Sequence, residues 1–150
     1  MTIYLVACSA RKLPHPAPAA DLYTGQSFKL ASEIAKLRST RWAILSAKHG
    51  LVEPDTQVEP YDLALRDASL EKRRAWGARV SAALHARGYR GERCVILAPR
   101  AYVVPILADR LGANMFEHYD TPLRGLGIGQ QLGWLAQELN QAKQLQLIGE

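Results

Sequence analysis

Four short apolar runs alternate along this 150-residue chain with segments of helical periodicity. The runs occupy residues 3–7, 41–47, 93–99 and 114–119, and the helical segments occupy residues 27–37, 69–88, 102–112 and 128–144. Because the runs do not alternate apolar with polar residues, they are typical of strands buried on both faces. Strands that are each followed by a helix favour a parallel sheet. We therefore predict an α/β fold with three α/β/α layers and a four-stranded parallel sheet.

Chain length and connectivity narrow the topology further. Right-handed crossovers favour the strand order 2-1-3-4, as in flavodoxin-like folds, with a switch point between the first and third strands. With 48% hydrophobic residues the chain can bury one ordinary core, so we expect a single domain over residues 1–150. No apolar run approaches the roughly 20 residues of a membrane span, and Met1 leads directly into a strand. We expect a cytoplasmic protein with no membrane partner.

The two cysteines of the chain indicate whether a disulfide is expected. Cys8 and Cys94 lie in separate predicted strands, and a single pair in this context predicts free thiols. The sequence has no CxxC or HExxH spacing, so we predict no metal and no other cofactor.

Charge is segregated along the chain, whose net charge is +5. Residues 66–100 carry nine Arg or Lys against three Asp or Glu, whereas residues 53–65 carry four acids and no base. A basic face beside an acidic loop suits an anionic partner, either nucleic acid or a nucleotide. The alternative is that these arginines form the solvated side of an amphipathic helix.

Polar and cationic residues follow each predicted strand. The segments are CSARK (8–12), SAKHG (46–50), APR (98–100) and YDTPLRGLGIG (119–129). In a parallel α/β sheet the carboxyl ends of the strands share one edge, and ligands bind beyond that edge. We therefore expect the four segments to converge on one ligand-sized cleft.

Several short motifs of this chain occur together in other proteins as well. They are CSARK, LYTGQSF, LSAKHGL and EPYD in that order, followed by PLRGLGIGQQLGWL near the end. This set resembles a family of small bacterial and phage proteins known only as a domain of unknown function. The Cys-Ser-x-x-Lys end is also similar to that of a domain in archaeosine-synthesis enzymes. That more distant similarity implies a uracil-DNA-glycosylase-like fold.

The tip of the first strand holds Cys8, Ser9 and Lys12. Cys8 is either a nucleophile activated by a nearby cation or a small residue packed as a hydrophobe. The Ser9 hydroxyl and the backbone N–H groups that follow it are suited to hold a phosphate or a base carbonyl, whereas Lys12 is either a ligand contact or a solvated charge.

The second tip places Lys48 and His49 between Ser46 and a glycine that can adopt positive φ. A tight turn there would aim both side chains into the cleft, where His49 could exchange a proton near neutral pH. The alternative is a histidine that makes only local hydrogen bonds.

The acidic loop VEPDTQVEPYD contains Tyr61 and Asp62 beside two prolines. In a reaction that breaks an N-glycosidic bond, a carboxylate can stabilise the sugar cation or activate water while an aromatic ring stacks on the base. Tyr61 and Tyr23 are candidates for stacking. The alternative is an exposed loop in which Asp62 caps a short helix.

The last segment places Arg124, Gly125, Gly127 and Gly129 before the final helix. Glycines let the backbone approach a ligand, and the free N–H groups of a helix start attract an anion. The spacing does not fit the dinucleotide-binding fingerprint, and a simple tight turn is the alternative.

Two functions of different classes remain. The first is an enzyme that processes a nucleobase or nucleotide and cleaves or exchanges an N-glycosidic bond, with Asp62, Lys48 and His49 as catalytic residues. The second is a nucleotide-sensing or nucleic-acid-binding module that uses the same pocket without turnover. Ionisable groups of both signs on one rim favour the enzyme. The predicted substrate-binding residues are Cys8, Ser9, Lys12, Tyr23, Ser46, Tyr61, Arg100, Arg124, Gly125, Gly127 and Gly129. The choice between DNA, RNA and free nucleotide, and the oligomeric state, stay open.

Overall fold

The computed structural model describes residues 2–39 and 41–149 of the chain. Within these residues a central sheet of five strands has the order β4-β3-β1-β6-β7. Strands β3, β1, β6 and β7 run parallel to one another, and β4 pairs with β3 in the antiparallel direction. The strands are β1 (Thr2–Ala7), β3 (Trp42–Ser46), β4 (Gly50–Val52), β6 (Gly91–Leu97) and β7 (Phe116–Asp120). The α/β class is confirmed.

The prediction of a four-stranded, all-parallel sheet is wrong, because β4 adds a fifth strand and makes the sheet mixed. Gly50 has a φ of 71°, which lets the chain turn back directly after residues 47–49. Gly50 then pairs with Ser46, and Leu51 pairs with Leu45. A three-residue strand behind a tight turn is too short to produce a periodic pattern, so the sequence predicts only the turn.

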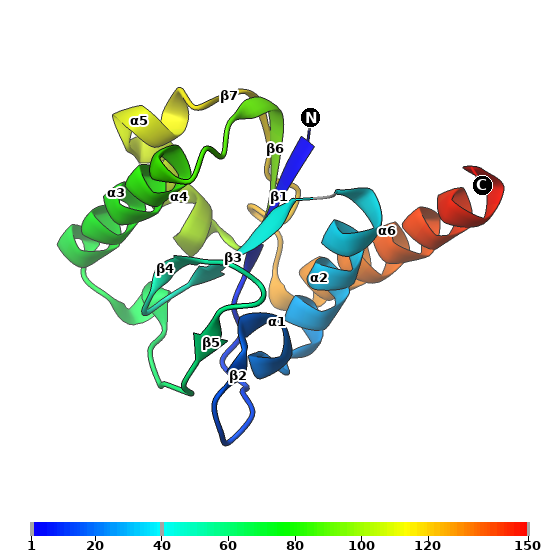
Figure 1. The fold of residues 1–150 in the computed structure, drawn as a ribbon, viewed down its shortest axis with the longest axis horizontal. Coiled ribbons are helices and arrows are strands. Elements are labelled where there is room, and N and C mark those ends of the chain that lie inside the picture. The colour runs from blue at the N-terminus through cyan, green and yellow to red at the C-terminus, as the bar shows by residue number, and fades with distance from the viewer. Residues whose placement is uncertain (1, 40, 150) are drawn as a thin grey trace.

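Helices cover both faces of the sheet (Figure 1). Alternate side chains of β1 enter two different cores: Ile3 and Leu5 pack with the first helical layer, and Tyr4 and Val6 pack with the second. Burial on both faces explains why this strand is a continuous apolar run. The first layer consists of α3 (Leu70–Ala86), α4 (Arg100–Ala108) and α5 (Arg110–Ala113), and the second of α2 (Gln26–Arg38) and α6 (Ile128–Gly149).

Local signals set the ends of α3. The Ser69 hydroxyl accepts a hydrogen bond from the backbone N–H of Lys72 at 3.1 Å, as an N-cap does. Gly88 follows the helix with a φ of 73°, and the N–H of Tyr89 donates to the carbonyl of Leu84 at 2.8 Å. This is the glycine stop expected at a helix C-terminus, so the predicted start and stop of α3 are confirmed.

The third predicted helix, residues 102–112, is two helices in the structure. The chain leaves α4 at Asp109, whose carboxylate accepts a hydrogen bond from the N–H of Gly112 at 3.2 Å and so begins α5. Before this break in the chain, α4 lies very close to α3. A Cβ atom at Gly77 would lie 2.3 Å from the carbonyl oxygen of Pro105, so only glycine permits this approach.

Additional segments cover the carboxyl edge of the parallel strands. Strand β2 (Ala17–Pro18) pairs antiparallel with β5 (Gln57–Val58), and α1 (Ala19–Leu22) follows β2. Figure 1 shows these elements below the sheet. The proline-rich segment LPHPAPAA (13–20) thus contributes β2 and the start of α1, with Ala17 and Ala19 buried. A short 3-10 helix, η1 (Leu65–Asp67), then leads to α3.

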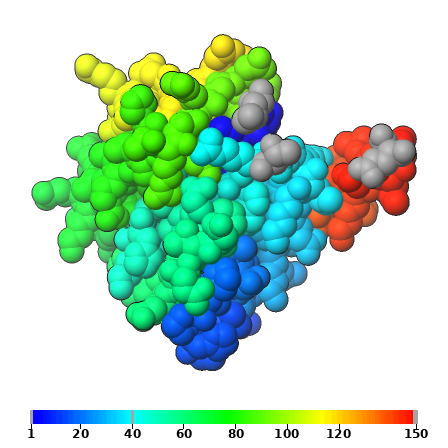
Figure 2. Space-filling model, viewed as in Figure 1, coloured from blue at the N-terminus to red at the C-terminus, as the bar shows by residue number. Residues whose placement is uncertain are grey.

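The sheet separates two hydrophobic cores, and two half-buried side chains at its carboxyl edge touch both. These are Cys8, directly after β1, and Tyr61, in the segment between β5 and η1. The last turns of α6 project from the body of the molecule (Figure 2). Among the described residues, no helix has the length and apolar content to cross a membrane.

Candidate functional site

A cavity of about 640 Å³ opens at the carboxyl ends of β1 and β6. We call it the strand-end cavity. Its walls come from the segment after β1, the end of β6, and the first turns of α2 and α6. The lining residues that bear on its chemistry are Cys8, Ser9, Arg11, Gly25, Gln26, Ser27, Arg66, Leu97, Ile128, Gln131, Leu132 and Leu135.

The electrostatics of this cavity favour an anion. Arg11 and Arg66 line it, and among the described residues no carboxylate does. The first turn of α2 also faces it, and Gly25 at the N-cap provides no side-chain cap for the free N–H groups. Unpaired N–H groups and the helix dipole give such a terminus a partial positive charge. The opposite wall is apolar and includes Leu97, Leu132 and Leu135, so the cavity offers both a cationic and a hydrophobic surface.

Ser9 fixes α2 against the end of β1. Its Oγ accepts a hydrogen bond from the N–H of Gly25 at 3.1 Å and donates to the carbonyl of Arg11 at 2.8 Å. A Cβ atom at Gly25 would lie 2.6 Å from the Cβ of Ser9, so the approach requires glycine. The structure therefore gives Ser9, predicted as a ligand contact, two intramolecular partners that shape the cavity wall.

A group of hydroxyl side chains lies behind Cys8. We call Tyr23, Tyr61, Tyr102 and Ser46, together with Cys8, the tyrosine cluster. The Tyr61 hydroxyl shares hydrogen bonds with the Tyr23 hydroxyl at 2.8 Å and with the Ser46 Oγ at 2.7 Å. The Cys8 Sγ lies 3.4 Å from the Tyr102 hydroxyl. Cys8 thus joins the strand-end cavity to the tyrosine cluster, which brings together four of the predicted site residues.

Two lysines and a histidine surround the ring of Tyr61. The Nζ of Lys12 lies 4.3 Å from the ring centroid, the Nζ of Lys48 lies 6.0 Å from it, and the His49 ring meets it edge-on at 5.5 Å. These distances are within the range of cation–π attraction. Burial raises the pKa of Tyr61, and the nearby Cys8 raises it further. Tyr61 is therefore a neutral hydroxyl that orients its neighbours rather than a base.

Lys48 and His49 face a different cavity. This second cavity, of about 520 Å³, lies between β4 and the acidic loop, and we call it the loop cavity. Partial burial lowers the pKa of His49, followed by the effects of Lys48 and Arg79, so its imidazole is mainly neutral at pH 7. Besides Lys48 and His49, its ionisable lining residues are Glu53, Glu59 and Arg87.

Glu53 is already engaged in the loop cavity. It accepts a hydrogen bond from the Tyr89 hydroxyl at 2.6 Å and pairs with Arg87 at 3.1 Å. Glu59, in contrast, is exposed. The loop cavity therefore combines an engaged carboxylate with one that faces solvent. No group of three or more His, Cys, Asp or Glu side chains within the described ranges could hold a metal ion.

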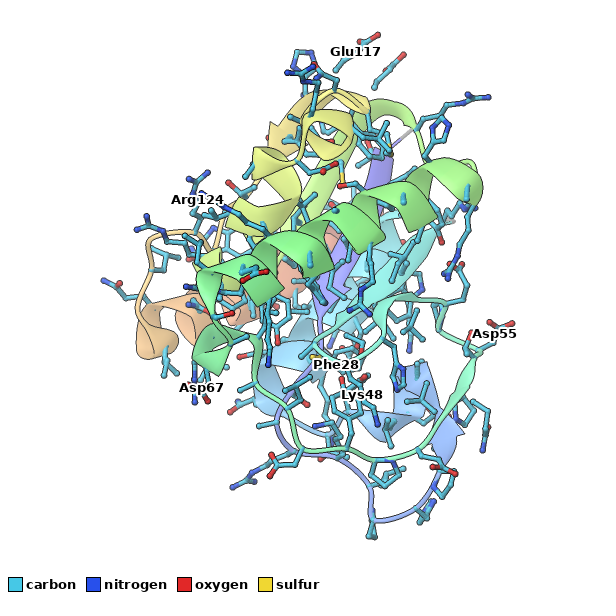
Figure 3. All side chains as sticks on the ribbon, turned by 90° about the vertical axis from the view of Figure 1, so that its left-hand side faces the viewer. Phe28, Lys48, Asp55, Asp67, Glu117 and Arg124 are labelled. Carbon is cyan, nitrogen blue, oxygen red and sulfur yellow. The ribbon has the colours of Figure 1, made fainter. Side chains whose placement is uncertain are left out.

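The remaining predicted residues do not line the strand-end cavity. Asp62 is exposed, and the described residues give it no hydrogen bond or ion pair; the cap of η1 is Ala64 instead. Arg100 lines a separate groove between α3 and α4. Figure 3 shows Arg124 on one side of the molecule and Lys48 well away from it, below α3. Arg124, Gly125, Gly127 and Gly129 are exposed, although their neighbours Leu123 and Ile128 do line the cavity.

Sequence reasoning missed three contributors to the site. Tyr102 lies in an apolar helical stretch, where its hydroxyl carries no separate signal. Arg66 is one of many bases in residues 66–100. The start of α2 is the third, and the glycine in LYTGQSF, directly before the helical repeat, is the signal that would have indicated an uncapped helix start.

No curated protein and no solved structure matches this chain. A sequence profile for a family of unknown function, DUF6884, matches residues 3–137. These residues include every strand of the sheet and every residue named above as lining the strand-end cavity. The chain is a member of the DUF6884 family of unknown function.

Proposed function

We propose that this protein binds a nucleotide, free or as part of a nucleic acid, in the strand-end cavity. The observation that carries the proposal is the pairing of a cationic surface with an apolar wall in one cavity, which no carboxylate of the described residues lines. A phosphate would occupy the space at the start of α2, near Arg11 and Arg66. The base would lie against Leu132 and Leu135 of α6. The volume of about 640 Å³ is within the range of small-molecule sites.

The proposal gives Cys8 and the tyrosine cluster a positioning role. The Cys8 thiol lines the cavity and offers a polar contact to the edge of a base, and the Tyr102 hydroxyl, 3.4 Å from the Cys8 Sγ, orients that thiol. The separation of Lys48, His49 and Asp62 from this cavity favours the binding module over the enzyme as the function of the strand-end cavity.

Ser27, in the first turn of α2, offers a sharp test. An aspartate there favours the helix, because a negative charge stabilises an N-terminus, but it repels a bound phosphate. We expect wild-type protein to gain thermal stability with nucleoside mono- or diphosphates, and Ser27→Asp to lose that gain without losing its own stability. Gln137→Glu, which adds the same charge at an exposed position of α6, should behave as wild type.

Mass spectrometry of small molecules that copurify with the native protein identifies the ligand class independently. Phosphorylated nucleosides in wild type and their absence in Ser27→Asp support the proposal. If no nucleotide copurifies and none raises the melting temperature, the proposed function is wrong.

N-glycosidic cleavage is the second candidate, and the loop cavity favours it. Lys48 and the neutral His49 lie there with the exposed Glu59, and all three flank the segment that carries Tyr61 and Asp62. In hydrolysis, the bond between base and sugar breaks, water supplies the hydroxyl to the sugar, and the base leaves with a proton. This second candidate includes the proposal that the fold is related to that of uracil-DNA glycosylases.

Release of free base tests this second candidate. Chromatography would follow normal and modified bases released from single- and double-stranded DNA, RNA and nucleotides. If the chain is a glycosidase, Asp62→Asn should reduce release by about 100-fold or more while binding stays within a few-fold. Absence of release from every substrate, with ligand binding intact, leaves the binding module.

A further inference from the structure

A second surface that could contact an anionic ligand lies between α3 and α4. It is a groove of about 450 Å³ with a mainly apolar floor, and we call it the arginine groove. Its lining residues are Leu70, Arg73, Arg74, Arg100, Ala101, Val104, Pro105 and Ala108.

The three arginines of this groove have no acidic partner among the described residues. Elsewhere in the molecule Arg38, Arg87 and Arg93 each pair with a carboxylate. Within the described residues, the guanidinium groups of Arg73, Arg74 and Arg100 make no ion pair or hydrogen bond. The Nε atom of Arg73 is moreover buried without a hydrogen-bond partner, and a buried donor left unpaired is unfavourable. Three unpaired cations around an apolar floor indicate that the arginine groove would bind an anionic ligand with flat apolar parts.

Helix geometry adds to this positive potential. Leu70 is the first residue of α3 and Arg100 is the first residue of α4, and both line the groove. Gly77 of α3 lies against Pro105 further along α4, so the two helices run in the same direction. Both N-terminal dipole ends therefore lie at the same end of the groove.

The groove adjoins the strand-end cavity. Pro99 lines the cavity, and the next residue, Arg100, lines the groove. Arg66 of η1 also lines the cavity, and η1 packs against α4. A chain of phosphates leaving the cavity would therefore reach Arg100 directly and then Arg73.

We propose that the ligand is a single strand of nucleic acid rather than a mononucleotide, and that the arginine groove holds the nucleotides next to the one in the strand-end cavity. This inference rests on the proposed function and names its ligand class. Phosphates pair with the three arginines, and an unstacked base covers the apolar floor formed by Val104 and Pro105. An acidic peptide would satisfy the same charges, but it would not account for the continuity with the strand-end cavity.

The test compares two ligands. Fluorescence anisotropy measures binding of a labelled single-stranded oligonucleotide of about 12 nucleotides, and thermal shift measures binding of nucleoside monophosphates. Arg73→Gln and Arg74→Gln should each weaken oligonucleotide binding about tenfold, as the loss of one charge-assisted hydrogen bond does. Each should also lower the slope of log K against log salt by about 0.7. Mononucleotide binding should stay unchanged in both variants.

Arg90→Gln is the matched control, because Arg90 is an exposed arginine directly before β6, at the opposite edge of the sheet. It should bind both ligands as wild type does. Arg74 is exposed, so its variant keeps the test valid if loss of the partly buried Arg73 disturbs folding.

The outcomes separate the two proposals. If mononucleotides bind but the oligonucleotide binds equally well to wild type and both groove variants, this inference is overturned and the proposed function stands. If neither ligand binds, both are overturned. Displacement of the oligonucleotide by an acidic peptide of equal charge at equal concentration would also overturn the inference that the arginine groove binds nucleic acid.

Discussion

At the residue scale, Tyr61 contacts polar side chains through both its hydroxyl and its ring. Its hydroxyl lies between those of Tyr23 and Ser46, and its ring lies beneath Lys12. The Ser46 Oγ in turn accepts a hydrogen bond from the N–H of His49 at 3.0 Å, and the Ser46 carbonyl accepts one from the Trp76 indole at 2.8 Å. Tyr61 thus ties the acidic loop to the end of β3.

Tyr61→Phe should lower the free energy of unfolding by about 1–3 kcal/mol, because it removes the hydrogen bonds that the Tyr61 hydroxyl shares with the buried Tyr23 and Ser46 hydroxyls. Urea unfolding measures the change. Ser46→Ala should have a smaller effect in the Tyr61→Phe background than in wild type, since the two side chains share one hydrogen bond. Strictly additive effects would show that the two residues act independently.

The two thiols, which are free as predicted, should differ in reactivity. Cys94 is fully buried, and burial raises the pKa of its thiol, whereas Cys8 is half-buried and lines the strand-end cavity. Iodoacetamide should therefore modify Cys8 in the folded protein and spare Cys94, and a bound nucleotide should slow the reaction at Cys8. Peptide mass spectrometry distinguishes the two sites, and equal modification of both would contradict the described burial.

Cys8 and Ser9 could be placed at the carboxyl edge from sequence, because residues that follow a buried parallel strand must emerge there. The position of Lys48 and His49 could not. The turn at Gly50 and the distant pairing of β2 with β5 decide which cavity these side chains face, and no local pattern records a pairing between residues 17 and 58.

At the element scale, glycines set how closely helices approach their neighbours. Gly25 lets the start of α2 lie against Ser9, and Gly77 lets α3 lie against α4. A Cβ atom at Gly133, on the exposed side of α6, would meet nothing within 4 Å. The same residue type therefore has opposite consequences in different helices.

Gly133→Ala should stabilise the protein by about 0.5–1 kcal/mol, because alanine favours a helix interior more than glycine does. Gly25→Ala should destabilise it, since the added methyl group would overlap Ser9 and separate α2 from the end of β1. Thermal unfolding measures both variants. A neutral Gly25→Ala would mean that α2 shifts without loss and that Ser9 does not fix the cavity wall.

Strands β1, β3 and β6 were predictable because their apolar runs are buried on both faces, whereas the edge strand β7 buries only Phe116. The division of the third helix into α4 and α5 was not, because it depends on Asp109 capping a second turn while α4 stays in contact with Gly77. Element identity followed from periodicity, and element boundaries followed from contacts between segments distant in the chain.

At the scale of the whole molecule, the sheet divides the interior into two cores with separate helical layers. This division follows from the sequence pattern, since each of the four predicted strands is followed by a helical repeat. The cover over the carboxyl edge does not. It is built from short pieces of residues 17–22 and 57–67 that are far apart in the chain and join through the pairing of β2 with β5.

Cys8 and Tyr61 each pack against both hydrophobic cores. The carboxyl edge of the sheet therefore connects the two helical layers through these two side chains. A ligand that immobilises Cys8 would restrict opening motions in α2 on one side and in α3 on the other. Amide hydrogen exchange should therefore slow in both helices together when the strand-end cavity is filled. Replacement of Tyr61 by alanine removes one of these two links and leaves Cys8 as the other, so the slowing in α3 should become smaller than in wild type and the protein should transmit ligand binding across its sheet less strongly.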